Sequence, residues 1–320
     1  MVAALRSFRT ARLADLIAFD RTEARIGARV HKDELARVYE VALGPAGRQV
    51  KLDGKTARPL ARYFGGFNVV VFTPEDLALP RGTPAERRKL LDRAVFNLRP
   101  DYLVTVQDYE KVLKQRNSLL RMAQEGMAPA RVEELLAVYD EQLARLGVAL
   151  ADARASYVQM LRDEHARAFL AITRGEPRAS ARYVSSTAGT SPDAVIARLR
   201  ELRARDLAAL TTGHGPHRDD LAFELDERDA GMFASQGQLR AIMLAWKTAE
   251  LEVLARAHGD PPILLLDDVS SELDPARNAY LFEHLATKAG QCFITTTHEG
   301  HVLVGQERAN YHIRDGQISS

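Results

Sequence analysis

Two adjacent acids are the residues best suited to chemistry. Asp267 and Asp268 directly follow the apolar run Ile263-Leu264-Leu265-Leu266. Carboxylates at the C-terminal end of a parallel strand stand where open α/β sheets bind their ligands. One acid can hold Mg²⁺, directly or through water, and the next can orient or deprotonate an attacking water. Paired acids also occur where a strand simply runs into a loop, so the pair alone leaves both interpretations open.

Three further motifs could belong to the same site as the acids. Asp274, within Ser271-Glu272-Leu273-Asp274-Pro275, suits a helix N-cap with Pro at the first position. Ser235-Gln236-Gly237-Gln238 fits a capping box, whose outward N–H groups and positive helix end suit a phosphate. His298 ends the run Thr295-Thr296-Thr297-His298, where it could contact a terminal phosphate or its attacking water. Each motif also has a structural interpretation, as a cap or as a polar loop residue.

The elements that would position these residues follow from hydrophobic patterning. Strands are expected at 263–266 and 291–296, flanking a helix at 275–289, which makes a βαβ unit with a parallel sheet. A helix from Gln238 to about Ala257 should carry one apolar face: Leu239, Ile242, Met243, Trp246, Ala249 and Val253. Strand-like runs occur at 26–30, 37–43, 67–73 and 221–225, and Asp53-Gly54 predicts a hairpin turn.

A long helical region separates the two mixed α/β parts. Residues 85 to about 174 are expected to be almost entirely helical, and two rows of residues recur every seven positions: Leu136, Leu143, Leu150 and Tyr157, and Tyr139, Leu146, Ala153 and Met160. Such rows indicate a helix packed along a partner in a coiled-coil-like hairpin. The expected partner is Tyr102 to Met122, with the turn near Glu125 to Pro129.

The motifs resemble those of a known family in their order and in their residues. A capped signature helix, a strand ending in acids, a D-loop and a switch histidine follow one another in ABC-type ATPases. The residues themselves resemble those of the RecF family of DNA replication and repair proteins. The resemblance lies at Leu264 to Asp274 with Arg277 and Leu281, at Pro74 to Leu77 and at Gly82 to Asp92. Leu90 departs from the aromatic residue that is usual there. Further similar stretches are Lys114-Gln115-Arg116-Asn117, Gly215-Pro216-His217-Arg218-Asp219-Asp220 and Arg6-Ser7-Phe8-Arg9-Thr10.

The resemblance implies a fold and a set of roles. The fold is α/β, an ABC-type ATPase head with a mixed β-sheet and an inserted, coiled-coil-like helical subdomain. The expected parts are residues 1–80, the N-terminal part of the ATPase lobe without its P-loop strand and helix; 81–178, the helical arm; and 179–320, the C-terminal ATPase lobe. The implied cofactors are ATP and Mg²⁺, with Asp267 serving the metal, Asp268 the water and His298 the γ-phosphate. In an ATP-dependent homodimer, the partner's ATP would be reached by Ser235, Gln236, Gly237, Gln238, Ser271 and Asp274.

The implied partners are duplex DNA, junctions of single and double strands, and the proteins RecO and RecR in recombinase loading. Net charge is only +1, but residues 81–121 carry ten Lys/Arg against five Asp/Glu. Five residues of this basic region could hold phosphates without reading sequence: Arg87, Arg88, Lys111, Lys114 and Arg116. Their alternative role is helix solvation, with intrahelical ion pairs such as Glu110 with Lys114.

The phosphate-cradling P-loop has no match in the sequence. Gly54-Lys55-Thr56 has the right ending, but the first Gly of the motif would fall on Gln49, and a hairpin turn explains these residues better. In RecF proteins the Arg-Ser-Phe-Arg stretch follows the P-loop, whereas here it begins at Arg6. Two explanations are open, a truncated gene model or a degenerate, non-catalytic paralogue. We expect the 320-residue chain to bind ATP weakly or not at all.

Composition and hydropathy exclude several classes of protein. The single cysteine, Cys292, excludes an internal disulfide framework and any multi-cysteine zinc site. No stretch approaches the roughly 18 apolar residues that span a bilayer, so we expect a cytosolic protein without a membrane partner. A rival from another class is an SMC-like DNA-binding or scaffold protein whose helical arm mediates association. The helical segment is short for a long coiled-coil arm, which counts against this rival.

Overall fold

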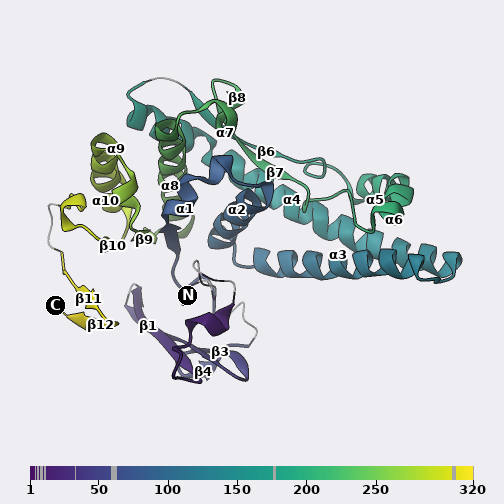
Figure 1. Ribbon diagram of the computed structural model, residues 1–320, viewed down its shortest axis with the longest axis horizontal. Coiled ribbons are helices and arrows are strands. Elements are labelled where there is room, and N and C mark those ends of the chain that lie inside the picture. Colours follow the sequence, from purple (N-terminus) through teal and green to yellow (C-terminus); the bar gives the residue numbers. More distant parts are fainter. Residues whose placement is uncertain are drawn as a thin grey trace.

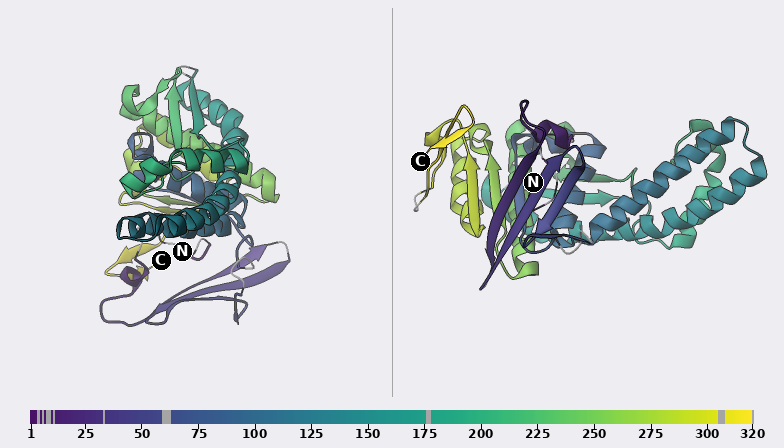
Figure 2. Two further views of the ribbon diagram at one scale, coloured as in Figure 1. Left: turned by 90° about the vertical axis from the view of Figure 1, so that its right-hand side faces the viewer. Right: turned by 90° about the horizontal axis from the view of Figure 1, so that it is seen from below.

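The computed structural model describes residues 1–3, 5, 7, 10, 12–32, 34–58, 63–175, 178–304 and 308–319. The stretch Arg6 to Thr10 therefore lies largely outside the described residues. The molecule is elongated, with a C-terminal lobe at one end and a helical arm at the other (Figure 1). An N-terminal β-sheet lies along one side, as the two further views show (Figure 2).

The N-terminal sheet is antiparallel and has its own small core. Its strands, in sheet order, are β1 (Ala24–Lys32), β2 (Leu35–Gly44), β3 (Gly47–Leu52) and β4 (Lys55–Thr56), preceded by the 3-10 turn η1 (Leu13–Leu16). Alternate residues of β2 point inward, so Tyr39, Val41 and Leu43 are buried. Asp53 and Gly54 join β3 to β4 with φ angles of 52° and 75°, as a two-residue hairpin requires. The hairpin prediction for Gly54-Lys55-Thr56 is confirmed.

A parallel sheet positions the paired acids. Its order is β10 (Gln291–Thr295), β9 (Ile263–Asp267), β5 (Val69–Phe72), and both pairs of neighbours are parallel. Between β9 and β10 the chain forms η4 (Val269–Glu272), α9 (Pro275–Tyr280), a π-helical turn (Leu281–Leu285) and α10 (Ala286–Lys288). This confirms the βαβ unit. On one face of the sheet, Phe72 and Leu266 are buried in the same core as the helix α8 (Gln236–His258).

The helical arm is a hairpin of α3 (Tyr102–Gln124) and α4 (Pro129–Thr173), entered through α2 (Pro84–Leu98). The first seven-residue row of α4, Leu136 to Tyr157, is fully buried as expected. The second row departs from expectation at its end, because Met160 is 50% exposed. α4 has 45 residues and α3 only 23, so α4 extends beyond α3, and it also packs against α8.

A third sheet joins the arm to the C-terminal lobe. It is antiparallel and contains β6 (Ala179–Val184), β7 (Asp220–Leu225) and β8 (Arg228–Asp229). The connection from β6 to β7 carries α5 (Pro192–Glu201) and α6 (Arg203–Ala209), which lie beside the arm (Figure 1). The remaining elements are α1 (Pro74–Leu77), η3 (Leu79–Arg81), α7 (Ala230–Phe233), η6 (Glu299–His301), β11 (His312–Arg314) and β12 (Gln317–Ser319).

One hydrophobic core crosses both expected boundaries, at 80/81 and 178/179. Phe72 of β5, Leu91 of α2, Tyr157 of α4 and Trp246 of α8 all belong to it. The base of the arm and the C-terminal lobe therefore fold around common side chains rather than around separate cores. Among the described helices, none combines the length and the apolar character that crossing a bilayer requires.

Candidate functional site

The two acids lie at the C-terminal end of β9, beside the end of β10. Thr295 Oγ1 donates a hydrogen bond of 2.6 Å to Asp267 Oδ1, and the Asp268 backbone N–H donates to the Thr295 carbonyl at 3.0 Å. The neighbouring strand thus orients the first acid through one of its oxygens. Sequence reasoning did not identify Thr295 in this role, although its place at the end of the next strand was visible.

Asp268 has an unusual backbone conformation. Its φ of 52° lies in the left-handed region, which aspartate tolerates better than most residues. Ser271 Oγ donates a 2.8 Å hydrogen bond to the Asp268 carbonyl and supports the turn. The carboxylate atom Asp268 Oδ1 is buried and has no protein partner. Strained backbone and an unpaired buried acceptor together are typical of a residue held for a ligand or a water rather than for packing.

Other unpaired buried polar atoms occur in the segment that follows Asp268. Besides Asp268 Oδ1, four such atoms belong to residues of the following segment: Ser270 Oγ, Arg277 Nε, Asn278 Oδ1 and His301 Nδ1. Buried polar groups are nearly always paired, with water where no protein group is available. These five atoms are therefore polar groups that water or phosphate oxygens could pair with.

The helix α8 begins with the expected capping box. Ser235 Oγ accepts from the Gln238 backbone N–H at 3.2 Å, and Gln238 Oε1 accepts from the Ser235 N–H at 2.8 Å. The N–H groups of Gln236 and Gly237 have no acceptor within the helix, because they lie in its first turn. They remain available to an external anion at the positive end of a 23-residue helix.

One ion pair and one close contact tie this helix start to the segment after the acids. Arg240 Nη2 lies 2.8 Å from Glu272 Oε2, and the Arg277 guanidinium pairs with Asp274 while lying against Gly237. Asp274 also caps α9, since its carboxylate accepts from the Arg277 backbone N–H. Burial tends to raise the pKa of Asp274, but its hydrogen bonds from Arg277 outweigh this and lower the pKa below the usual value. Signature and D-loop residues of the sequence analysis are thus coupled within one subunit.

His298 follows β10 and is exposed at the same edge of the sheet as Asp267. Its backbone N–H donates to Thr296 Oγ1 at 3.1 Å, which forms a tight turn. Three residues further on, the His301 carbonyl accepts from Asn278 Nδ2 at 2.8 Å, so α9 supports this loop. The His298 ring lies 5.4 Å from the His301 ring, centroid to centroid.

The residues present fit Mg²⁺ only in company with phosphate. Among the described residues, no cluster of three or more His, Cys, Asp or Glu side chains could hold a metal ion by itself. Asp267 has one carboxylate oxygen engaged by Thr295, which leaves the other for a metal or its water. Mg²⁺ is commonly held by one or two carboxylates together with substrate phosphates and water.

A buried lysine connects α8 to α1, a link that the sequence did not reveal. Lys247 is 3% exposed, and its Nζ lies 3.5 Å from Asp76 and 3.3 Å from Glu250. Asp76 in turn accepts from Arg93 at 3.1 Å. Asp76 belongs to the RecF-like stretch Pro74 to Leu77, and this resemblance is the sequence feature that could have pointed to the contact.

The structure of the arm excludes one of the five residues predicted to contact DNA. Arg116 is fully buried, where Nε donates to Asp140 at 2.8 Å and Nη1 donates to Asp206 at 2.7 Å. Arg203 also binds Asp140, at 2.5 Å. Arg116 is therefore a core ion pair and cannot reach a DNA phosphate. The sequence did not predict this burial, because Arg116 stands in the hydrophilic run Lys114-Gln115-Arg116-Asn117. Only the fold shows that its side chain faces α4 and α6.

The other four candidates divide into two kinds. Arg87 pairs bidentately with Asp220, at 2.8 and 2.6 Å, and Arg88 donates to the Asp219 carbonyl at 2.7 Å. These two arginines thus connect α2 to β7. Lys111 and Lys114 are exposed on α3 and remain candidates for phosphate contact.

The Gly215 to Asp220 stretch is the junction of the arm. His217 bridges Tyr109 and Thr212, through Nδ1 at 2.7 Å and Nε2 at 2.9 Å. Arg154 donates to the Pro216 carbonyl at 2.8 Å, and Tyr183 donates to Asp219 at 2.5 Å. Burial lowers the pKa of His217 to about 4, so its ring is neutral at physiological pH. This stretch therefore positions helices and strands, a role that the sequence analysis left open.

The fold and the site define an ABC-type ATPase head with an inserted helical region. No protein-family model matches the chain. It is 41% identical over 305 residues to the DNA replication and repair protein RecF of Myxococcus xanthus, covering 92% of this chain and 79% of that protein. RecF of Citrifermentans bemidjiense is 37% identical over 330 residues, with 99% and 87% covered. The chain belongs to the RecF family.

Solved structures agree with this assignment. Two structures of the recombination mediator protein RecF in the RecFOR pathway, designated RecF-ATPrS and RecF-ATP, match with TM-scores of 0.87 and 0.85. Both are 28% identical to this chain, and the matches cover 99% and 98% of it and 85% and 84% of those chains. The predicted fold class is therefore confirmed.

Proposed function

We propose that the chain is a DNA repair and replication protein that binds DNA at gaps and junctions in the cytosol, as an ATP-dependent dimer, and promotes recombinase loading with RecO and RecR. Membership of the RecF family is the observation that carries this proposal. The RecF structures designated with ATP and placed in the RecFOR pathway support the cofactor and the two protein partners. In this proposal residues 1–80 are the N-terminal part of the ATPase lobe, residues 81–178 the helical arm and residues 179–320 the C-terminal ATPase lobe.

Within the proposed site, bound ATP with Mg²⁺ would supply the phosphoryl group and its charge. Asp267, oriented by Thr295, would accept a metal-bound water or the metal. Asp268 would orient the attacking water and accept its proton, because its Oδ1 is buried and unpaired. His298 would approach the γ-phosphate from the next loop. An aspartate is shorter than the glutamate usual at the second position, so slow hydrolysis is expected.

The signature half would act on nucleotide held by a second subunit. Ser235, Gln236, Gly237 and Gln238 offer a capped helix start, and Ser271 and Asp274 lie in the segment coupled to it through Arg277 and Arg240. A Gly-x-x-x-x-Gly-Lys-Ser/Thr sequence is not among the 320 residues. We therefore assign these residues the water-activating and trans-acting roles and not the phosphate cradle.

The test uses the chain alone and a version to which a Walker A strand, loop and helix have been added, called here the supplemented chain. Calorimetric titration should detect weak or no ATP binding by the chain alone, and a micromolar affinity would refute that expectation. With ATP, the supplemented chain should dimerise and bind gapped duplex DNA. Dimers that form equally without ATP would favour the alternative, a non-catalytic SMC-like scaffold.

A further inference from the structure

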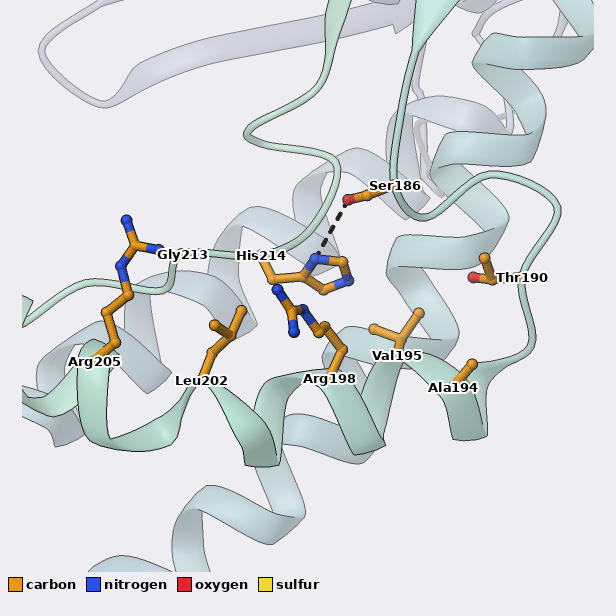
Figure 3. Close-up of a pocket in the computed structure, with 9 residues that line it drawn as sticks. All are labelled: Ser186, Thr190, Ala194, Val195, Arg198, Leu202, Arg205, Gly213 and His214. Carbon is orange, nitrogen blue, oxygen red and sulfur yellow. Dashed lines mark hydrogen bonds between the residues drawn. The ribbon is translucent and has the colours of Figure 1, made fainter.

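A pocket of about 330 Å³ lies beside the arm, at the opposite end of the molecule from the paired acids (Figures 1 and 3). Its floor is apolar, formed by Val195 and Leu202 of the α5–α6 segment. Arg198 and Arg205 rise from the same segment, and His214 and Ser186 come from two loops above it (Figure 3). None of these residues belongs to the ATPase motifs.

The loop that carries His214 is fixed from beneath. The Gly213 backbone N–H donates to Asp206 at 2.9 Å, and Asp206 is held by the buried Arg116. The neighbouring Thr212 donates from its backbone N–H to Asn117 at 2.9 Å. The pocket wall is thus anchored to the core of the arm, and little ordering is needed when a ligand enters.

The pocket has more cationic donors than acceptors. Among the described residues, Arg205 has no hydrogen-bond or ion-pair partner, and Arg198 pairs only with Glu201, at 2.8 Å between side chains that are both more than half exposed. Such an exposed pair is weak and easily displaced. Asp206, the other nearby acid, is already neutralised internally by Arg116. The pocket therefore favours an anion.

The arrangement separates two anionic positions by an apolar one. Arg198 belongs to α5 and Arg205 to α6, and Leu202, at the turn between the two helices, lies between them (Figure 3). Arg198 and His214 both line the pocket. Burial and then Arg198 lower the pKa of His214, so the ring is uncharged at neutral pH and presents a flat face. Inorganic phosphate offers one charge centre and no apolar group, and it would use only part of this site.

We propose that this pocket binds a segment of single-stranded nucleic acid, with backbone phosphates on Arg198 and Arg205 and an intervening base against Leu202 and His214. Guanidinium forks match phosphate oxygens, and flat side chains stack with bases of any sequence. The concave site suits a flexible strand better than the rigid surface of a duplex. The proposal rests on the DNA-binding function above and adds a second, single-strand site to it.

The test measures binding of a fluorescent 12-nucleotide single strand to the 320-residue chain by anisotropy over a range of salt concentrations. Arg205→Ala and Arg198→Ala should each weaken binding about tenfold, the equivalent of one charge-assisted hydrogen bond, and reduce the salt slope by about 0.7. The matched control is Arg200→Ala, which removes the same charge from an exposed position of α5 outside the pocket. Its affinity and slope should stay close to the native values.

Direct contact is tested by photocrosslinking a bromodeoxyuridine-substituted strand and mapping the modified peptide. The crosslink should fall on the peptide that contains His214. If Arg200→Ala and Arg205→Ala lose the same affinity for the single strand, binding depends only on net charge and the pocket proposal is wrong. Displacement of the strand by an acidic peptide and not by unlabelled single strand would overturn the assignment to nucleic acid. If the supplemented chain with ATP binds gapped duplex DNA but neither chain binds the single strand, the pocket proposal fails alone. If the supplemented chain with ATP does not bind gapped duplex DNA, the proposed function fails instead.

Discussion

A side-chain carbon at Gly237 would lie 3.2 Å from both terminal nitrogens of Arg277. The start of the signature helix and the cap of α9 therefore meet through a guanidinium that only a bare backbone accommodates without adjustment. Arg277 also pairs with Asp274. The two segments proposed to face a partner's nucleotide are therefore in contact through this one side chain.

Replacing Gly237 by Ala should separate stability from assembly. Alanine is favoured over glycine in helices by about 1 kcal/mol, and the end of the Arg277 side chain can shift, so thermal stability should be unchanged or slightly raised. ATP-dependent dimerisation of the supplemented chain, measured by light scattering, should be weakened, because the added methyl group covers the N–H groups of the first turn. Unchanged dimerisation would show that this turn does not approach the nucleotide.

Replacing Asp268 by Asn in the supplemented chain should prolong the ATP-bound dimer. The amide keeps the shape of the carboxylate but cannot accept the proton of the attacking water. Dimer lifetime after dilution of ATP, followed by fluorescence transfer between labelled subunits, is the measurement. A lifetime equal to that of the unsubstituted protein would exclude Asp268 as the base.

Arg116 should matter for stability and not for direct DNA contact. Arg116→Met leaves Asp206 buried without its cation and Asp140 with Arg203 alone, and breaking a buried ion pair costs about 3–5 kcal/mol. Urea denaturation should report this loss in the free energy of unfolding. Lys114→Met, an exposed change on the same helix, should alter it by no more than about 0.5 kcal/mol. Similar stability for the two variants would contradict the buried role.

Lys111 and Lys114 carry the remaining prediction for DNA on α3. Changing both to Gln should reduce the salt slope of duplex binding by about 1.8, if each lysine neutralises one phosphate. A control with the same loss of charge is available in Lys51→Gln with Lys55→Gln, at exposed positions of the N-terminal sheet. A similar change of slope in both double variants would indicate that only net charge matters.

Stability should fall as the medium becomes acidic. Burial lowers the pKa of His165 to about 4 in the folded protein, against about 6.5 when unfolded. Between these values the unfolded chain binds more protons, so acidification favours unfolding, by on the order of 3 kcal/mol for this group. Urea denaturation at pH 7, 6 and 5 should follow this trend. His165→Leu should weaken the trend, because only His217 then remains of the two histidines whose pKa burial lowers to about 4, and His31→Gln, at an exposed position, should leave it intact.

The sequence by itself determined much of the architecture. The apolar run before Asp267, the Ser235 to Gln238 capping box, the Asp53-Gly54 hairpin and the row from Leu136 to Tyr157 are all local patterns. Local patterns fix elements because the strand and helix periods, the caps and the turns depend on residues only a few positions apart. Their order along the chain was sufficient to indicate the RecF family.

Only the tertiary structure decided which charged residues are buried and which are free. Arg116 and Lys114 are two positions apart in one basic stretch, yet one is a core ion pair and the other is exposed. Their difference depends on Asp140 and Asp206, which lie 24 and 90 residues away in sequence. A charged side chain enters a core only where distant partners compensate its lost hydration. The contact of Gly237 with Arg277 and the pocket at His214 arise in the same way, from segments that the chain brings together only on folding.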